Sequence, residues 1–180
     1  MYKIESAHVV RNCTSKRCSH NYHGHSGKIE VFFKSRGLDT AGMIIDFGRL
    51  RKPIGAFIDM FDHSIHLWEG DDNDNIEFFK KKNERYVILP FNPTAENYAL
   101  FFKCVINKLL SYIKPINGEN GVYCKGVRYH ETDTGYAESE QEDLEICNLK
   151  DIIVSYESMN SEMWEIYKAI PKDERWIIGD

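Results

Sequence analysis

The stretch Cys18-Ser-His-Asn-Tyr-His23-Gly-His25-Ser-Gly-Lys-Ile-Glu-Val-Phe-Phe33 combines a thiol and three imidazoles with a regular alternation of side chains. One face of an extended segment would carry His23, His25, Gly27, Ile29, Val31 and Phe33. A period of two with apolar residues on one face predicts a half-buried β-strand. The buried face of this strand therefore begins with two histidines, and a polar segment that contains Cys18 precedes it.

A second alternating segment lies near the beginning of the sequence. Its inward face would carry Tyr2, Ile4, Ser6, His8 and Val10. Residues 11 to 22 are polar and rich in turn-forming side chains, which predicts a loop. Two strands joined in this way can pair as a hairpin, and the pairing would bring His8 next to the other two inward histidines.

Three inward imidazoles on paired strands predict a metal site. Burying them without a partner would be costly, whereas imidazole nitrogens are common zinc ligands. A single histidine on an apolar face is more often a hydrogen-bonded core residue, but the trio favours Zn2+ bound by His8, His23 and His25. A structural zinc finger that also used Cys13 and Cys18 is a weaker alternative, because its spacing fits no finger pattern.

Length and composition restrict the classes of protein that fit. The 180 residues are 42% hydrophobic, enough for one substantial core and one main domain. Five cysteines and no apolar run at the N-terminus favour a reducing, cytoplasmic location. No stretch approaches the roughly 18 apolar residues of a membrane span. A net charge of -5 gives no general electrostatic reason to bind nucleic acid or an anionic membrane.

Two segments have helical periodicity. The first covers residues 47–61 after Asp46, a good N-cap, and it contains Pro53, which should kink it or mark the start of its second part. The second follows Thr94, a strong N-cap candidate, and keeps an apolar face as far as Ile113. The apolar faces of the two helices are expected to lie in the core.

Two sets of polar side chains outside the histidine cluster are candidates for chemistry. If Asp62 fixes the tautomer of His63, the imidazole becomes a positioned proton donor or acceptor, and the thiol of Cys18 is its natural partner. Glu131 continues the apolar face of an alternating segment and would suit the N–H edge of a guanidine-like heterocycle. The other interpretation places the Asp-His pair on a solvated surface and Glu131 at a frayed strand end.

Six short motifs follow one another along the sequence. They are Ser6-Ala-His8, Cys18 before His23-Gly-His25, Ile44-Ile-Asp46-Phe47, Asp62-His63, Asn92-Pro-Thr94-Ala-Glu96-Asn97 and Glu131-Thr132. In this order they resemble the 6-pyruvoyl-tetrahydropterin synthase and 6-carboxytetrahydropterin synthase family, over residues 1 to 138. The resemblance implies an α+β tunnelling fold (T-fold), with an antiparallel four-stranded sheet and two helices on one face. It also implies a homo-oligomer, a trimer or hexamer, with active sites at subunit interfaces.

The resemblance assigns a role to each candidate residue. His8, His23 and His25 would bind the zinc ion. Cys18 would be the catalytic thiol, and Asp62 with His63 would relay protons. Glu131 would anchor the pterin ring, with Thr94 and Thr132 nearby. The implied enzyme is a carbon-oxygen or carbon-carbon lyase that acts on 7,8-dihydroneopterin triphosphate. Candidates for the triphosphate are the nearby cations Arg11, Lys16, Arg17 and Lys28.

The spacing between Cys18 and His23 bears on the product. Four residues separate them, whereas the bacterial 6-carboxytetrahydropterin synthases typically have three and the animal pyruvoyl enzymes five. The segment from Asn92 to Asn97 favours the carboxy enzyme of queuosine-type 7-deazaguanine biosynthesis, which releases acetaldehyde and triphosphate. The alternatives are a 6-pyruvoyl-tetrahydropterin synthase and, in another class, a zinc-stabilised pterin-binding protein without turnover.

Three segments have no counterpart in the motifs. Residues 69–85 form a charged insertion to which we assign no chemistry, and residues 86–90 resemble a short edge strand. Residues 139–180 begin with an acidic linker and continue with a strand, a short helix and the apolar Trp176-Ile-Ile. We therefore divide the chain into a synthase domain at 1–138 and an extension at 139–180, which packs on the core or on a neighbouring subunit.

Overall fold

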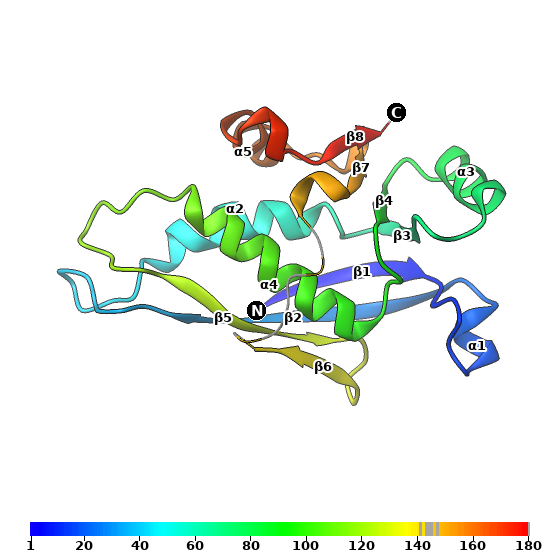
Figure 1. The fold of residues 1–180 in the computed structure, drawn as a ribbon, viewed down its shortest axis with the longest axis horizontal. Helices are drawn as coiled ribbons and strands as arrows, with labels where there is room; N and C mark the ends of the chain where they lie inside the picture. The colour runs from blue at the N-terminus through cyan, green and yellow to red at the C-terminus, as the bar shows by residue number, and fades with distance from the viewer. Residues whose placement is uncertain (141, 143–145, 147, 180) are drawn as a thin grey trace.

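A computed structural model describes residues 1–140, 142, 146 and 148–179 (Figure 1). Its strands are β1 (Tyr2–His8), β2 (His23–Lys34), β3 (Ser64–Trp68), β4 (Tyr86–Leu89), β5 (Tyr123–His130), β6 (Tyr136–Ser139), β7 (Ile153–Ser155) and β8 (Ile177–Gly179). Its α-helices are α1 (Lys16–Ser19), α2 (Phe47–Asp59), α3 (Asn73–Lys82), α4 (Ala95–Ser111) and α5 (Ser161–Ala169). Short 3-10 helices cover Leu149–Asp151, Tyr156–Ser158 and Lys172–Glu174.

The predicted hairpin of β1 and β2 is confirmed. The two strands are antiparallel, with His8 opposite His23 and Ser6 opposite His25. Ile4 and Ile29 on the inward faces are fully buried. The alternation in the sequence therefore has its structural counterpart, because residues two apart share the face that is covered by helices.

The sheet is larger than the resemblance implies. Its strand order is β6-β5-β2-β1-β3-β4-β7-β8, so the expectation of four antiparallel strands holds only for β6, β5, β2 and β1. Beyond β1 the sheet is mixed, because β3 pairs parallel with β1 and β4 pairs parallel with β3. The prediction of an edge strand at residues 86–90 is wrong: β4 lies between β3 and β7, and its four residues are buried.

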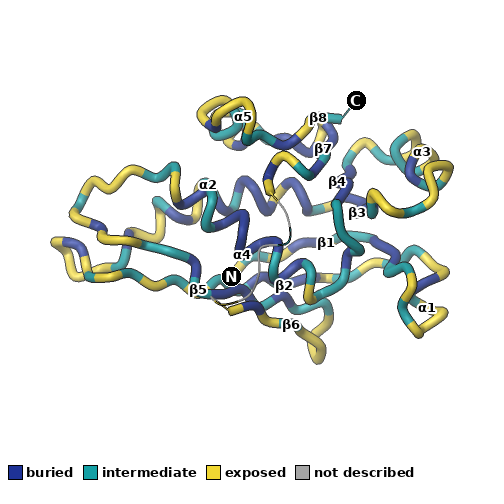
Figure 2. The backbone as a smooth tube through the Cα atoms, viewed as in Figure 1, coloured by how far each residue is buried: buried dark blue, intermediate teal, exposed yellow. Residues whose placement is uncertain are grey.

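The two predicted helices lie over one face of the sheet, as Figure 1 shows for α2 and α4. Both predicted N-caps are confirmed, since Asp46 accepts a hydrogen bond from the N–H of Gly48 and Thr94 accepts one from the N–H of Asn97. Helix α2 runs through Pro53 without a break. The buried backbone in Figure 2 is concentrated where these helices meet the sheet, which is where the main core forms.

The C-terminal extension continues the same sheet. Strand β7 pairs antiparallel with β4, β8 pairs parallel with β7, and α5 packs on α2. Trp176 is 1% exposed, and its ring lies 5.7 Å from that of Phe57 in α2. Asp143 and Glu145 of the acidic linker lie outside the described residues. The division into two domains between residues 138 and 139 stays a prediction.

The longest helix in the described part of the chain, α4, has 17 residues. Within the described ranges, no helix combines the length and the apolar character that crossing a bilayer would require.

We predict that Trp176→Ala destabilises the protein by about 3–5 kcal/mol, because a buried tryptophan leaves a large cavity when truncated. Chemical denaturation of the two proteins measures the difference. Ile177→Ala is the matched control: its side chain is 54% exposed, and we expect a loss of about 0.5 kcal/mol or less. Equal losses for both variants would contradict the assignment of Trp176 to the core.

Candidate metal centre and its surroundings

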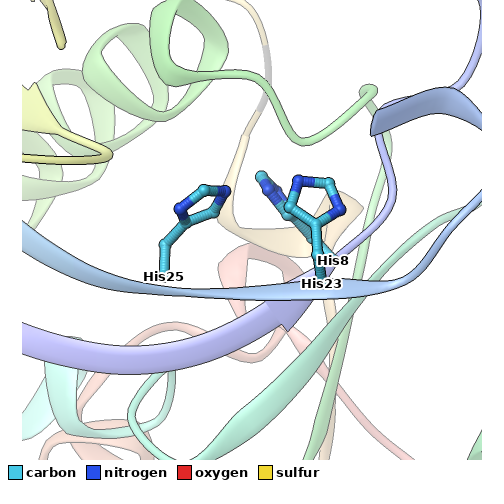
Figure 3. A group of neighbouring side chains, drawn as sticks. All are labelled: His8, His23 and His25. Atoms are coloured by element: carbon cyan, nitrogen blue, oxygen red, sulfur yellow. The ribbon is translucent and has the colours of Figure 1, made fainter. Parts of the chain in front are cut away.

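Three histidines converge where β1 ends and β2 begins. In Figure 3 the rings of His8, His23 and His25 rise from the two strands on the same side and lie next to one another. Their ring centroids are 4.8 to 5.1 Å apart, and one ligand nitrogen from each lies within 4.8 Å of the others. The register of β1 and β2 produces this arrangement, which can hold a metal ion.

The hydrogen bonds around the cluster leave one nitrogen of each ring available. Nδ1 of His23 lies 2.9 Å from the carbonyl oxygen of Asn21, so this nitrogen carries a proton. The backbone of Pro93 lies near His8 and opposes the lowering of its pKa. Nε2 of His8 and Nε2 of His25 are buried and have no hydrogen-bond partner within the described chain. Two orphaned nitrogens, beside a third ring whose Nδ1 is held by a carbonyl, fit the pattern of metal-bound imidazoles.

The protonation state also suits a metal. Burial and the nearby His23 lower the pKa of His8 to about 3. Burial lowers the pKa of His25 as well, although the carboxylate of Glu131 opposes this effect. His8 is therefore neutral near pH 7, and its free nitrogen can donate an electron pair to an ion.

Glu131 faces the cluster. Its Oε1 lies 3.5 Å from Nε2 of His8 and 4.0 Å from Nε2 of His25. It follows directly after β5, whose pairing with β2 carries it to the histidines. The side chain is 29% exposed, so its carboxylate can contact a small molecule that enters beside the three histidines.

Two tyrosines that the periodicity marks only as core support His8. Tyr98 of α4 stacks on Tyr129 with a centroid distance of 4.7 Å and lies 6.4 Å from His8. A Cβ at Gly27 would lie 2.8 Å from the Tyr129 hydroxyl, so glycine allows this close approach. The Tyr98 hydroxyl also pairs with Nδ1 of the fully buried His66. No sequence signal distinguishes these residues from ordinary core positions.

Cys18 lies in α1, a single helical turn next to the end of β1. Its backbone carbonyl accepts a hydrogen bond of 3.0 Å from the N–H of Val10, two residues after His8. Its thiol is not in a disulfide, and the residue is partly exposed. The loop expected at residues 11–22 is thus held beside the end of the hairpin that carries the three histidines.

Asp62 and His63 form the predicted pair. Oδ2 of Asp62 lies 2.9 Å from Nδ1 of His63, while Oδ1 accepts a hydrogen bond of 2.7 Å from the N–H of Glu5. The backbone of His63 has φ of 50°, a left-handed conformation that is uncommon for a side-chain-bearing residue. The aspartate holds the proton on Nδ1, which leaves Nε2 as the group that can accept or deliver a proton.

This pair is not brought to the three histidines within one chain. The His63 side chain is 74% exposed and borders an open pocket of about 680 Å³. Its lining residues are Glu5, Ser6, Ala7, His63, Ser64, Ile65 and residues 82–85, which include neither Cys18 nor a histidine of the cluster. Contact between His63 and Cys18, which the sequence suggests, is absent from the described part of a single chain.

The two predicted substrate-binding threonines have structural roles here. Thr94 caps α4, and the backbone of its neighbour Pro93 lies near His8. The hydroxyl of Thr132 accepts a hydrogen bond of 2.9 Å from the N–H of Gly135, in the turn after Glu131. Both therefore lie on segments that reach the cluster. Their contact with a substrate stays a prediction.

A mixed sheet with two helices on one face and a candidate three-histidine metal site at a hairpin defines a class of α+β proteins. The family model described as 6-pyruvoyl tetrahydropterin synthase matches residues 1–142. The chain belongs to this family.

Individual relatives extend the comparison. The chain is 37% identical to a 6-carboxy-5,6,7,8-tetrahydropterin synthase of Helicobacter pylori strain J99, over 97% of this chain and 91% of the relative. This match includes most of the C-terminal extension. A protein of the same description from Rickettsia felis is 29% identical, over 64% of this chain and 80% of the relative.

Solved structures share the fold. An uncharacterized protein of Wolinella succinogenes has a TM-score of 0.57 at 22% identity and covers 78% of this chain and 95% of its own. A catalytic-residue mutant of Plasmodium vivax 6-pyruvoyltetrahydropterin synthase has a TM-score of 0.59 at 16% identity, over 77% and 91% of the two chains. The architecture is thus that of the T-fold family, in a version whose sheet is extended.

We predict that His23→Ala weakens metal binding by at least about 100-fold, since loss of even an outer-shell partner costs roughly 10–100-fold. Metal per chain, measured by elemental analysis after dialysis, should fall from one ion to near zero. His20→Ala is the control. His20 is exposed, its Nδ1 forms a hydrogen bond with the hydroxyl of Ser19, and its ring is not part of the cluster. Loss of the metal from the His20 variant would indicate a different ligand set.

Proposed function

We propose that this protein is a zinc-dependent 6-carboxy-5,6,7,8-tetrahydropterin synthase. It would convert 7,8-dihydroneopterin triphosphate and water to 6-carboxytetrahydropterin, acetaldehyde and triphosphate, in a 7-deazaguanine pathway of the queuosine type. The observation that carries the proposal is the trio of converging histidines, two of which have an orphaned Nε2 atom, in a chain that aligns along 97% of its length with a protein of this description.

Zn2+ fits the donor set because it accepts three imidazole nitrogens and keeps a position open for a substrate. His8, His23 and His25 would hold it, with the Asn21 carbonyl fixing the ring of His23. When bound, the ion would act as a Lewis acid on the side-chain oxygens of the substrate.

Proton transfer falls to the residues around this centre. Cys18 would act as a general base or acid through its thiolate, and Asp62 would hold His63 in the tautomer that exchanges a proton at Nε2. Protons must move between carbon and oxygen of the substrate side chain before triphosphate leaves. Two groups of different character allow one to remove a proton while the other supplies one.

Binding of the pterin ring would rest on Glu131. A carboxylate accepts two parallel N–H bonds from a heterocycle edge as it does from arginine, and the position of Glu131 beside the histidines would orient the side chain of the substrate toward the metal. Thr94 and Thr132 would complete this part of the site from the start of α4 and the turn after β5.

The pyruvoyl reaction is the alternative outcome at the same site, and the intermediate spacing between Cys18 and His23 leaves it chemically open. A zinc-stabilised pterin-binding protein without turnover is the alternative of another class. The alignment with 6-carboxytetrahydropterin synthases along nearly the whole chain favours the carboxy enzyme.

We expect zinc-loaded protein to form 6-carboxytetrahydropterin and acetaldehyde from 7,8-dihydroneopterin triphosphate, as measured by mass spectrometry and an acetaldehyde assay. Cys18→Ala should lower kcat by roughly 10²–10⁴-fold, the usual contribution of a positioned acid or base, and should retain one zinc per chain. Cys13→Ala, in the same segment, is the control and should stay near wild type. Formation of pyruvoyl-pterin would support the alternative enzyme, and a silent Cys18→Ala would support the binding protein.

We further propose that the active protein is a homo-oligomer in which His63 serves the metal centre of a neighbouring subunit. The support is the separation described above: His63 opens onto a pocket that contains no member of the histidine cluster. A complete set of proton-transfer groups would then require two chains.

Mixing two inactive variants tests this arrangement. Cys18→Ala and His63→Ala should each be inactive alone, but oligomers reassembled from an equal mixture should recover about a quarter of wild-type activity if each site combines Cys18 and His63 from different chains. Activity after denaturation and refolding together is the measurement. No recovery from a mixed oligomer verified by mass would show that both groups come from one chain.

A further inference from the structure

The segment that carries Cys18 has little internal structure of its own. Helix α1 is one turn long, and Asn21 donates to the carbonyls of Lys16 and Arg17 at its end. A reactive thiol needs a defined position, since a misplacement of about 1 Å can cost 10²-fold in rate. Contacts with the rest of the protein must therefore hold the thiol in place.

Arg11 supplies one of them, from the N-terminal side of the segment. Its NH1 group donates a hydrogen bond of 2.9 Å to the carbonyl of Ser19, the residue after Cys18. Its Nε lies 3.0 Å from both carboxylate oxygens of Asp71. The backbone N–H of Arg11 is fixed separately, by the side-chain oxygen of Asn92. The guanidinium group thus connects Asp71 to the Cys18 turn.

Tyr22 supplies the second contact, from the C-terminal side. Its hydroxyl donates a hydrogen bond of 3.3 Å to Oδ2 of Asp71, and its ring lies 4.0 Å from that of Phe79 in α3. The next residue along the chain is the metal-cluster residue His23. One carboxylate therefore contacts the Cys18 segment on both sides of the thiol.

Asp71 belongs to the charged insertion at residues 69–85, and its side chain is only 8% exposed. It is 60 residues away from Arg11 in the sequence. The pairing of a mostly buried carboxylate with a guanidinium and a phenol favours one geometry. Leaving the carboxylate or the guanidinium unpaired would be costly.

We propose that Asp71 is a positioning residue for Cys18, acting through Arg11 and Tyr22. The charged insertion thereby has a role in the reaction although it contributes no group to it. This inference rests on the proposed function, in which Cys18 is the reactive thiol. It also explains how a segment with an intermediate spacing before His23 is held in place.

Asp71→Asn tests the inference because it removes the charge and keeps the shape. We expect kcat to fall roughly 10- to 100-fold with KM changed less than about threefold and with one zinc per chain retained. Asp74→Asn is the matched control: it makes the same change in charge on α3 at an exposed position, and it should behave as wild type. Asp71→Glu, which keeps the charge, should recover part of the lost activity.

Alkylation of Cys18 by iodoacetamide provides a readout that does not depend on turnover. Trypsin separates Cys13, in the peptide 12–16, from Cys18, in the peptide 18–28, so each rate can be followed by mass spectrometry. We expect Asp71→Asn to raise the alkylation rate of Cys18 several-fold and to leave that of Cys124, which is 1% exposed, unchanged. General destabilisation would instead raise both rates.

The outcomes separate the two proposals. If the wild type turns over and Asp71→Asn retains its kcat and its Cys18 alkylation rate, the positioning role is wrong and the proposed function stands. If the wild type fails to turn over but Cys18 alone becomes more reactive in Asp71→Asn, the proposed function is wrong and the positioning of the segment stands.

If Asp71→Asn fails to fold, Arg11→Lys is used for the same two measurements. This variant retains the positive charge of residue 11 but loses the forked contact with Asp71 and Ser19.

Discussion

The antiparallel pairing of β1 with β2 is the constraint on which the rest of the structure depends. It sets His8 opposite His23 and Ser6 opposite His25, so three imidazoles emerge on one face. A slip of one residue would turn His23 and His25 to the opposite face together with Ile29, and the core would lose its cover at the same time. The core and the candidate metal centre therefore depend on the same register of this hairpin.

The sequence predicts those parts of the molecule in which a regular period meets a specific chemistry. Alternation over β1 and β2 is enough to find His8, His23 and His25, and the caps at Asp46 and Thr94 are visible because capping is local. The role of β4 is not visible, because a strand that is buried on both faces has no alternation and its partner β7 lies far along the chain. The Asn21 carbonyl that holds Nδ1 of His23 escapes prediction for another reason: it depends on backbone geometry and not on the side chain of Asn21.

The candidate site combines parts of different rigidity. The histidines stand on strands in the middle of a sheet, whereas Cys18 and His63 occupy a helical turn and a left-handed turn. Contacts from distant segments support both turns. Asp71 contacts the Cys18 turn through Arg11. The backbone of Glu5 and the guanidinium of Arg85 hold the His63 turn through Asp62. The ligands of a metal need a rigid support. Groups that transfer protons must occupy one position during the reaction, and hydrogen bonds to charged partners can hold them there.

The central position of β4 has a consequence for the newly made chain. About sixty residues separate the end of β4 from the start of β7, so at ribosomal speeds β4 waits on the order of 3 to 13 s for its second neighbour. During this time Tyr86-Val-Ile-Leu89 presents an open, apolar strand edge, the kind of surface through which nascent chains associate with one another. Lys80, Lys81 and Lys82 end the helix just before it, and their like charges oppose such association until the last strands arrive.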